Sequence, residues 1–72
     1  MINTIKLKAK IFENGYNIDR FAETIGMSAT TLRKKVKGKT DFQLGETISI
    51  KKKLGLNTKD YIDIFFGNEL EL

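Results

Sequence analysis

Apolar residues recur along this chain at the three- and four-residue intervals typical of helices, in short blocks separated by glycines. Five of the six glycines, at positions 15, 26, 38, 55 and 67, stand 11 to 17 residues apart, and proline is absent. Because glycine readily adopts the backbone conformation that ends a helix, this spacing predicts short helices with abrupt ends. The 72 residues are therefore expected to form one all-α domain of five helices, with residues 67–72 as a frayed tail.

The first predicted helix covers about 4–14. Its alternation of apolar and basic residues also suits a strand, but Ile5, Ala9 and Phe12 share one helical face, which favours a helix. A neighbouring face carries Leu7 and Ile11. Of the phenylalanines, Phe12, Phe21 and Phe42 are expected in the core.

The remaining helices are predicted from similar stripes. The second begins after Asn17, and its inner residues are Phe21, Ala22 and Ile25. The third begins at Ser28, and its inner residues are Leu32 and Val36. The fourth, about 44–54, is expected to bury Leu44, either Ile48 or Ile50, and Leu54. The fifth opens at Asn57 or Thr58 and carries Tyr61, Ile62, Phe65 and Phe66.

Residues 18–38 combine the features of two helices joined by a tight turn. Ala22 is small enough to let the helices approach, and Gly26 can take the positive φ that reverses the chain. Ser28 can cap the next helix, and Gly38 can end it. This pattern predicts a helix-turn-helix, whose second helix is built to lie in the major groove of DNA.

Basic and acidic residues are segregated along the chain. The first 59 residues hold all thirteen basic and five of the nine acidic side chains, a net charge of +8, and residues 60–72 carry −4. Residues 28–39 contain five basic residues and no acidic one. Because this basic zone coincides with the second helix of the motif, it indicates a polyanionic partner, namely DNA.

The composition excludes several other classes of protein. Neither cysteine nor histidine occurs, so the commonest nucleophiles, general bases and zinc ligands are missing. We expect no enzymatic activity, metal, cofactor or small-molecule ligand. No apolar run reaches the roughly 18 residues of a membrane span, and the N-terminus does not resemble a signal peptide. The expected location is the cytoplasm, without a membrane partner.

On these residues the chain resembles the lambda-repressor/Cro-type helix-turn-helix family, also called the XRE family. It most resembles the short regulators of Gram-positive phages and integrated elements. The shared residues are Ala22, Gly26, Met27, Ser28, Leu32 and Gly38, and the five-helix plan extends the match over 4–66. One departure is Lys35, at a position where the family often buries an apolar residue.

The resemblance implies which residues meet DNA, because in this family the start of the third helix meets base edges while flanking groups hold phosphates. The implied base contacts are Ala29, Thr30, Arg33 and Lys34. The implied phosphate contacts are Ser28, Thr31, Lys37 and Lys39. Arg33 is the best candidate for direct readout, because its planar fork matches the acceptors of guanine. Other lysines are interpreted as solvated surface: Lys35, Lys51, Lys52 and Lys53.

Small DNA-binding domains of this kind usually bind DNA as dimers, and a dimer requires a second contact surface on each protein. The candidates for a dimer or partner interface are Phe65, Phe66, Leu70 and Leu72, unless one of the two phenylalanines closes the core instead.

Two functions follow from this sequence. The first is a sequence-specific transcriptional regulator, a repressor or Cro-like protein that occupies a double-stranded DNA operator. The alternative is a modulator or antirepressor of a phage lysogeny switch that binds another repressor protein. The short side chain of Ala29 and the acidic, phenylalanine-rich C-terminal region favour the alternative.

Overall fold

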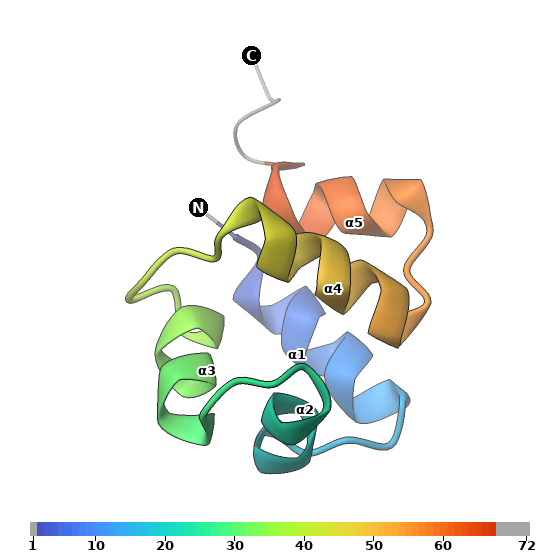
Figure 1. Ribbon diagram of the computed structural model, residues 1–72. Coiled ribbons are helices and arrows are strands. Elements are labelled where there is room, and N and C mark those ends of the chain that lie inside the picture. The colour runs from blue at the N-terminus through green and yellow to red at the C-terminus, as the bar shows by residue number, and fades with distance from the viewer. Residues whose placement is uncertain (1, 68–72) are drawn as a thin grey trace.

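Five α-helices make up the part of the chain that the computed structural model describes, residues 2–67. Their bounds are α1 Thr4–Glu13, α2 Ile18–Thr24, α3 Ala29–Val36, α4 Leu44–Leu54 and α5 Thr58–Phe65. Figure 1 shows α1 in the middle, with α2 and α3 on one side of it and α4 and α5 on the other. The predicted all-α class and the number of helices are confirmed, and residues 2–67 contain no strand.

Asparagine and serine side chains begin four of the helices. The side-chain oxygens of Asn3, Asn17, Ser28 and Asn57 each accept a hydrogen bond from a backbone N–H in the first turn of the helix that follows. These contacts satisfy N–H groups that have no partner within the helix. The helix starts predicted after Asn17 and at Ser28 are confirmed to within one residue.

The core lies where the five helices meet. Its buried residues are Leu7, Ile11, Phe21, Ala22, Leu32, Val36, Ile50, Leu54, Leu56, Ile64 and Phe65. The inner residues predicted for α3 are confirmed, and Phe21 and Ala22 of α2 are buried as predicted. Ile25 and Phe42 are only partly buried and pack against this core. No helix within the described range is long and apolar enough to cross a lipid bilayer.

Two sequence predictions about the core are wrong. In α1, Leu7 and Ile11 are buried, whereas Ile5 is 81% exposed and Phe12 is 55% exposed, so Phe12 is not a core residue. A helix in a small bundle buries one stripe, and the adjacent apolar face of α1 stays in solvent. In α4, Leu44 is 65% exposed, contrary to the prediction.

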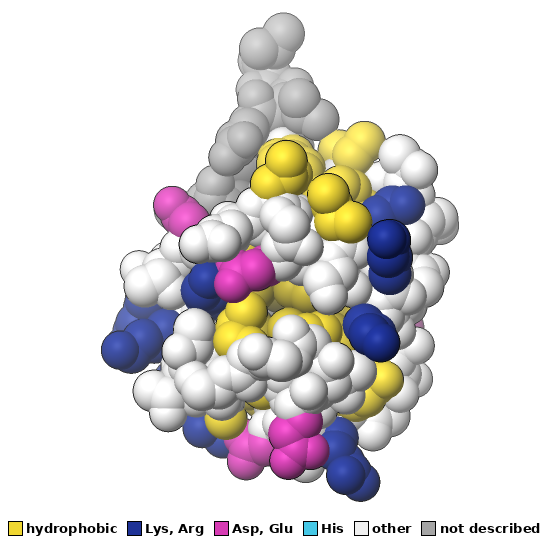
Figure 2. Space-filling view, viewed as in Figure 1, with side chains coloured by type: hydrophobic (Ala, Val, Ile, Leu, Met, Phe, Trp, Pro, Cys, Tyr) yellow, Lys and Arg dark blue, Asp and Glu magenta, His cyan; other side chains and the backbone are white. Residues whose placement is uncertain are grey.

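The buried face of α4 is set by Thr47 and Ile50, which the helical repeat places beside Leu54. Thr47 is buried without an unsatisfied hydroxyl, because its Oγ1 donates to the Leu44 carbonyl at 2.7 Å and lies 2.8 Å from the Tyr61 hydroxyl. Leu44 therefore stays outside. Figure 2 shows exposed apolar side chains over α4 and α5, at the top of the view.

Candidate nucleic-acid interface

The turn between α2 and α3 fixes these two helices against each other. Gly26 has a φ of +73°, a conformation that residues with a side chain rarely adopt. The chain then reverses, and the Met27 N–H donates to the Ala22 carbonyl at 2.9 Å. Ala22 itself is buried, which allows α2 and α3 to contact each other. The roles predicted for Ala22 and Gly26 are confirmed.

Burial of Leu32 and Val36 orients α3, because it leaves the opposite face of the helix in solvent. That outer face carries Thr30, Arg33, Lys34 and Lys37, all exposed. Figure 2 shows basic side chains gathered at the edge of the molecule beside α3. The outer face of α3 can therefore offer hydrogen bonds and positive charge to a polyanion. Ala29, the fourth expected base contact, is only partly exposed and packs against the core.

The start of α3 is occupied by hydroxyl groups that bond to each other. Ser28 Oγ accepts from the Thr31 N–H at 3.1 Å, and its own hydroxyl donates to Thr31 Oγ1 at 2.8 Å. Both residues are exposed, so a phosphate can approach them. At the other end, Lys37 and Lys39 are exposed, with no carboxylate within 4.0 Å among residues 2–67.

Arg33 is paired with an acidic residue of α2, a contact that was not predicted from the sequence. Its guanidinium donates to the carboxylate of Asp19 in the first turn of α2. The side chains of Arg33 and Asp19 are 48% and 64% exposed, so the pair is screened by water and can open. The two residues are fourteen positions apart, and no local sequence pattern reveals such a contact.

The prediction that Lys35 is a solvated surface residue is wrong. Its side chain is only 12% exposed, and its Nζ lies 2.6 Å from Glu46 Oε1 of α4 and 5.9 Å from the centre of the Phe42 ring. Burial alone would raise the pKa of Glu46, but the bonds from Lys35 and from the Gln43 N–H lower it below its ordinary value. The methylene groups of Lys35 are thus buried as an apolar side chain would be, and its ammonium group anchors α3 to α4.

Phe65 cannot contribute to an interface, because it is only 3% exposed. Its ring packs against those of Phe42 and Tyr61, with centroids 5.6 and 5.5 Å away, and closes the core. Phe66 is partly buried against Tyr61. The other two candidates for the dimer or partner interface, Leu70 and Leu72, lie outside the described residues.

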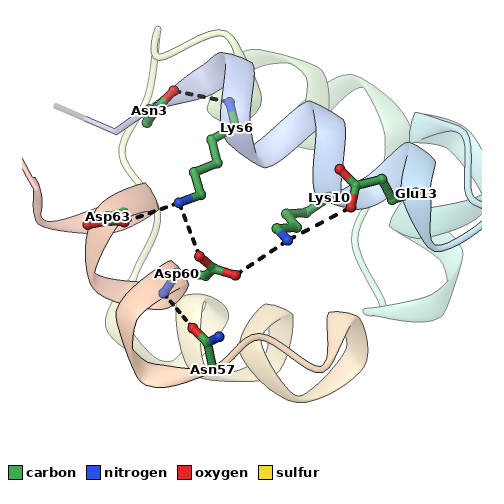
Figure 3. Close-up of polar contacts among 7 residues, drawn as sticks. All are labelled: Asn3, Lys6, Lys10, Glu13, Asn57, Asp60 and Asp63. Carbon is green, nitrogen blue, oxygen red and sulfur yellow. Dashed lines mark hydrogen bonds and ion pairs between the residues drawn. The ribbon is translucent and has the colours of Figure 1, made fainter.

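The acidic residues of α5 are paired within the fold. Figure 3 shows Lys6 and Lys10 of α1 reaching toward Asp60, which lies 3.1 and 3.3 Å from their ammonium groups, while Lys6 also lies 3.1 Å from Asp63. Hydrogen bonds from Lys6 and Lys10 lower the pKa of Asp60, and those to Asp60 and Asp63 raise the pKa of Lys6. Two carboxylates of the acidic C-terminal region are therefore engaged by lysines of α1.

Comparisons of the chain with protein-family models, with curated proteins and with solved structures found no match. Within residues 2–67, no group of three or more acidic, histidine or cysteine side chains comes together to hold a metal ion. The basic outer face of α3 is therefore the candidate site.

Proposed function

We propose that this protein is a sequence-specific DNA-binding regulator of the lambda-repressor type, which places α3 in the major groove of its operator. The observation that carries the proposal is the exposed face of Thr30, Arg33, Lys34 and Lys37 on a helix whose other side is locked in the core. A helix fixed in this way presents its hydrogen-bonding groups in one geometry, as base readout requires.

In this arrangement α2 and α3 act as a helix-turn-helix. Thr30, Arg33 and Lys34 meet base edges, while Ser28, Thr31, Lys37 and Lys39 hold phosphates. Arg33 must exchange its contact with Asp19 for one with a base or phosphate. Because both partners are exposed to water, this exchange costs about 1 kcal/mol or less. Bound to its operator, the protein would exclude RNA polymerase.

A gel-shift titration with the DNA that flanks the gene tests the proposal. Arg33→Ala is expected to weaken binding by about 1–3 kcal/mol and to relax specificity at one base pair. Lys53→Ala, an exposed lysine on α4, is the matched control and should leave binding unchanged. Retention of the operator with unchanged affinity by Arg33→Ala would contradict the placement of α3.

One observation favours a second function, the modulation of another repressor by direct binding. Ala29 is partly buried and offers only a methyl group, and Arg33 is already paired with Asp19. Few side-chain groups of α3 are therefore free to recognise bases. The same gel shift separates the two functions when a neighbouring regulator is added. Loss of the neighbour's shift, with no shift from this protein alone, would assign the modulator function.

A further inference from the structure

A strip of exposed apolar side chains runs along the outer face of α1. Ile5 and Phe12 lie on it, and both are exposed because α1 turns Leu7 and Ile11 into the core instead. The two exposed side chains are seven residues apart, which is two helical turns, or about 10 Å.

Phe12 also lines a groove where α1 faces the start of α2 and the C-terminal half of α3. The α1–α3 groove has a volume of about 370 Å³ and is lined by Lys8, Phe12, Ile18, Arg33, Val36 and Lys37. Its lining is half apolar and half cationic, and among residues 2–67 no acidic residue contributes to it.

The cations of this groove are available to a partner. Within the described part of the chain, Arg33 is paired only with the exposed Asp19, and Lys8 and Lys37 have no carboxylate within 4.0 Å. By contrast, Lys6 and Lys10, on the other side of α1, are paired with the acidic residues of α5. The α1–α3 groove is therefore a positively charged site with an exposed aromatic ring.

We propose that the α1–α3 groove and Ile5 form a docking site for an acidic amphipathic helix of a partner protein. Two apolar anchors two turns apart match the spacing with which a helix presents its apolar face to a groove. Carboxylates beside those anchors would meet Lys8 and Lys37. The sugar-phosphate backbone of DNA would satisfy the lysines but would offer nothing apolar to Phe12, so the mixed lining favours a protein.

A helix docked here would also cover Arg33 and Lys37. Because the proposed DNA contacts use these same residues, the partner and the operator would compete, and the groove would be a site of control over DNA binding. The docking site goes beyond the proposed regulator function and does not depend on it, since the groove exists whether or not α3 binds DNA. Only its control over DNA binding rests on the proposed function.

Selection from a library of random peptides of about 16 residues, enough for about four helical turns, tests the proposal on the 72-residue chain. Enriched peptides are expected to be acidic and to carry apolar residues seven positions apart. Enrichment of basic or neutral peptides would overturn the proposal.

The affinity of the best peptide is then measured by fluorescence anisotropy. Phe12→Ser should weaken binding about tenfold (about 1.4 kcal/mol), whereas Leu44→Ser, which removes an apolar side chain of α4 that is at least as exposed, should not. Lys8→Glu should also weaken it about tenfold, and Lys52→Glu, with the same change of charge on α4, by no more than about twofold. The proposed site would be overturned if Phe12→Ser and Leu44→Ser changed the peptide affinity equally, or if Lys8→Glu and Lys52→Glu did.

Two further outcomes identify a different occupant and so overturn the proposal. If peptide affinity rises when residues 68–72 are deleted, the groove belongs to the chain's own C-terminal segment. If Phe12→Ser weakens binding to the operator duplex as much as binding to the peptide, Phe12 belongs to the DNA interface. Because the peptide and DNA titrations are separate experiments, a negative result for the docking site does not contradict the proposed DNA-binding function, and the reverse also holds.

Discussion

The Lys35 ammonium lies 2.6 Å from Glu46 Oε1 and joins α3 to α4. Glu46 lies in the first turn of α4, and the same carboxylate oxygen accepts a hydrogen bond at 2.8 Å from the N–H of Gln43, the residue before the helix. One carboxylate thus helps to start α4 and also holds α3. Since α3 carries the exposed basic face, this contact, together with the burial of Leu32 and Val36, sets the direction in which that face points.

Lys35→Ala should lower the free energy of unfolding by about 1–2 kcal/mol, between the values typical of exposed and of fully buried ion pairs. The substitution removes the methylene stem and leaves Glu46 partly buried without its cation. Urea denaturation measures the effect. Lys34→Ala, one residue away and exposed, is the control and should stay within about 0.5 kcal/mol of the parent. Similar losses in both variants would show that Lys35 is no anchor.

Stability should fall in acid through Glu46 and Asp60. The pKa of each carboxyl is lower in the folded protein than its ordinary value, 4.5 for Glu46 and 3.8 for Asp60. Below those values the unfolded chain binds more protons than the folded one. The stability that these groups contribute is therefore complete above the ordinary pKa and is lost as the pH falls through the folded pKa.

The melting temperature, followed by circular dichroism from neutral pH into the acid range, measures this loss. Glu46→Gln should flatten the acid limb of the profile, because a group that no longer titrates contributes no proton uptake. Glu23→Gln, an exposed residue of α2 with no ion pair within the described range, should leave the profile unchanged. If the parent protein, Glu46→Gln and Glu23→Gln showed the same acid limb, proton uptake by Glu46 would not be linked to stability.

Much of the fold is predictable from sequence because its signals are local. Asn17 and Ser28 mark helix starts through bonds that span only three residues, and Gly26 marks a turn through its own φ. The choice of buried face is not local. Phe12 and Leu44 each belong to an apolar stripe, yet both are exposed, because the neighbouring helices pack against the adjacent stripe of α1 and against the Thr47 side of α4.

The candidate site was predictable to a similar extent. The exposure of Thr30 and Lys34 follows from the burial of Leu32 and Val36 on the same helix. The ion pair of Arg33 with Asp19 joins residues far apart in the sequence and depends on the angle between two helices. The sequence contains both residues, but only the tertiary arrangement brings them together.

That ion pair should restrain DNA binding. If Arg33 must leave Asp19 to reach the operator, Asp19→Asn should tighten binding about fivefold (about 1 kcal/mol). Glu23→Gln removes the same charge from the same helix without touching Arg33, and should change the affinity less. Anisotropy titration of a labelled operator duplex measures both. Equal gains would mean that only the net charge of α2 matters.

The final prediction concerns the salt dependence of DNA binding and rests on Lys37. In the proposed complex this lysine neutralises one phosphate and releases its counterion, and it makes no base contact. Lys37→Ala should therefore weaken specific and non-specific duplexes alike and should reduce the slope of log K against log salt concentration by about 1. Lys53→Ala, which removes the same charge from an exposed position on α4, should leave the slope as it is.

The slopes come from anisotropy titrations at several salt concentrations, with each variant checked for its helical content. A slope that changes equally for the two variants would mean that DNA responds to the overall positive charge of the protein. A slope that changes for Lys37→Ala alone would place the end of α3 against the phosphate backbone, because counterion release reports contacts and is insensitive to distant charges beyond the screening length.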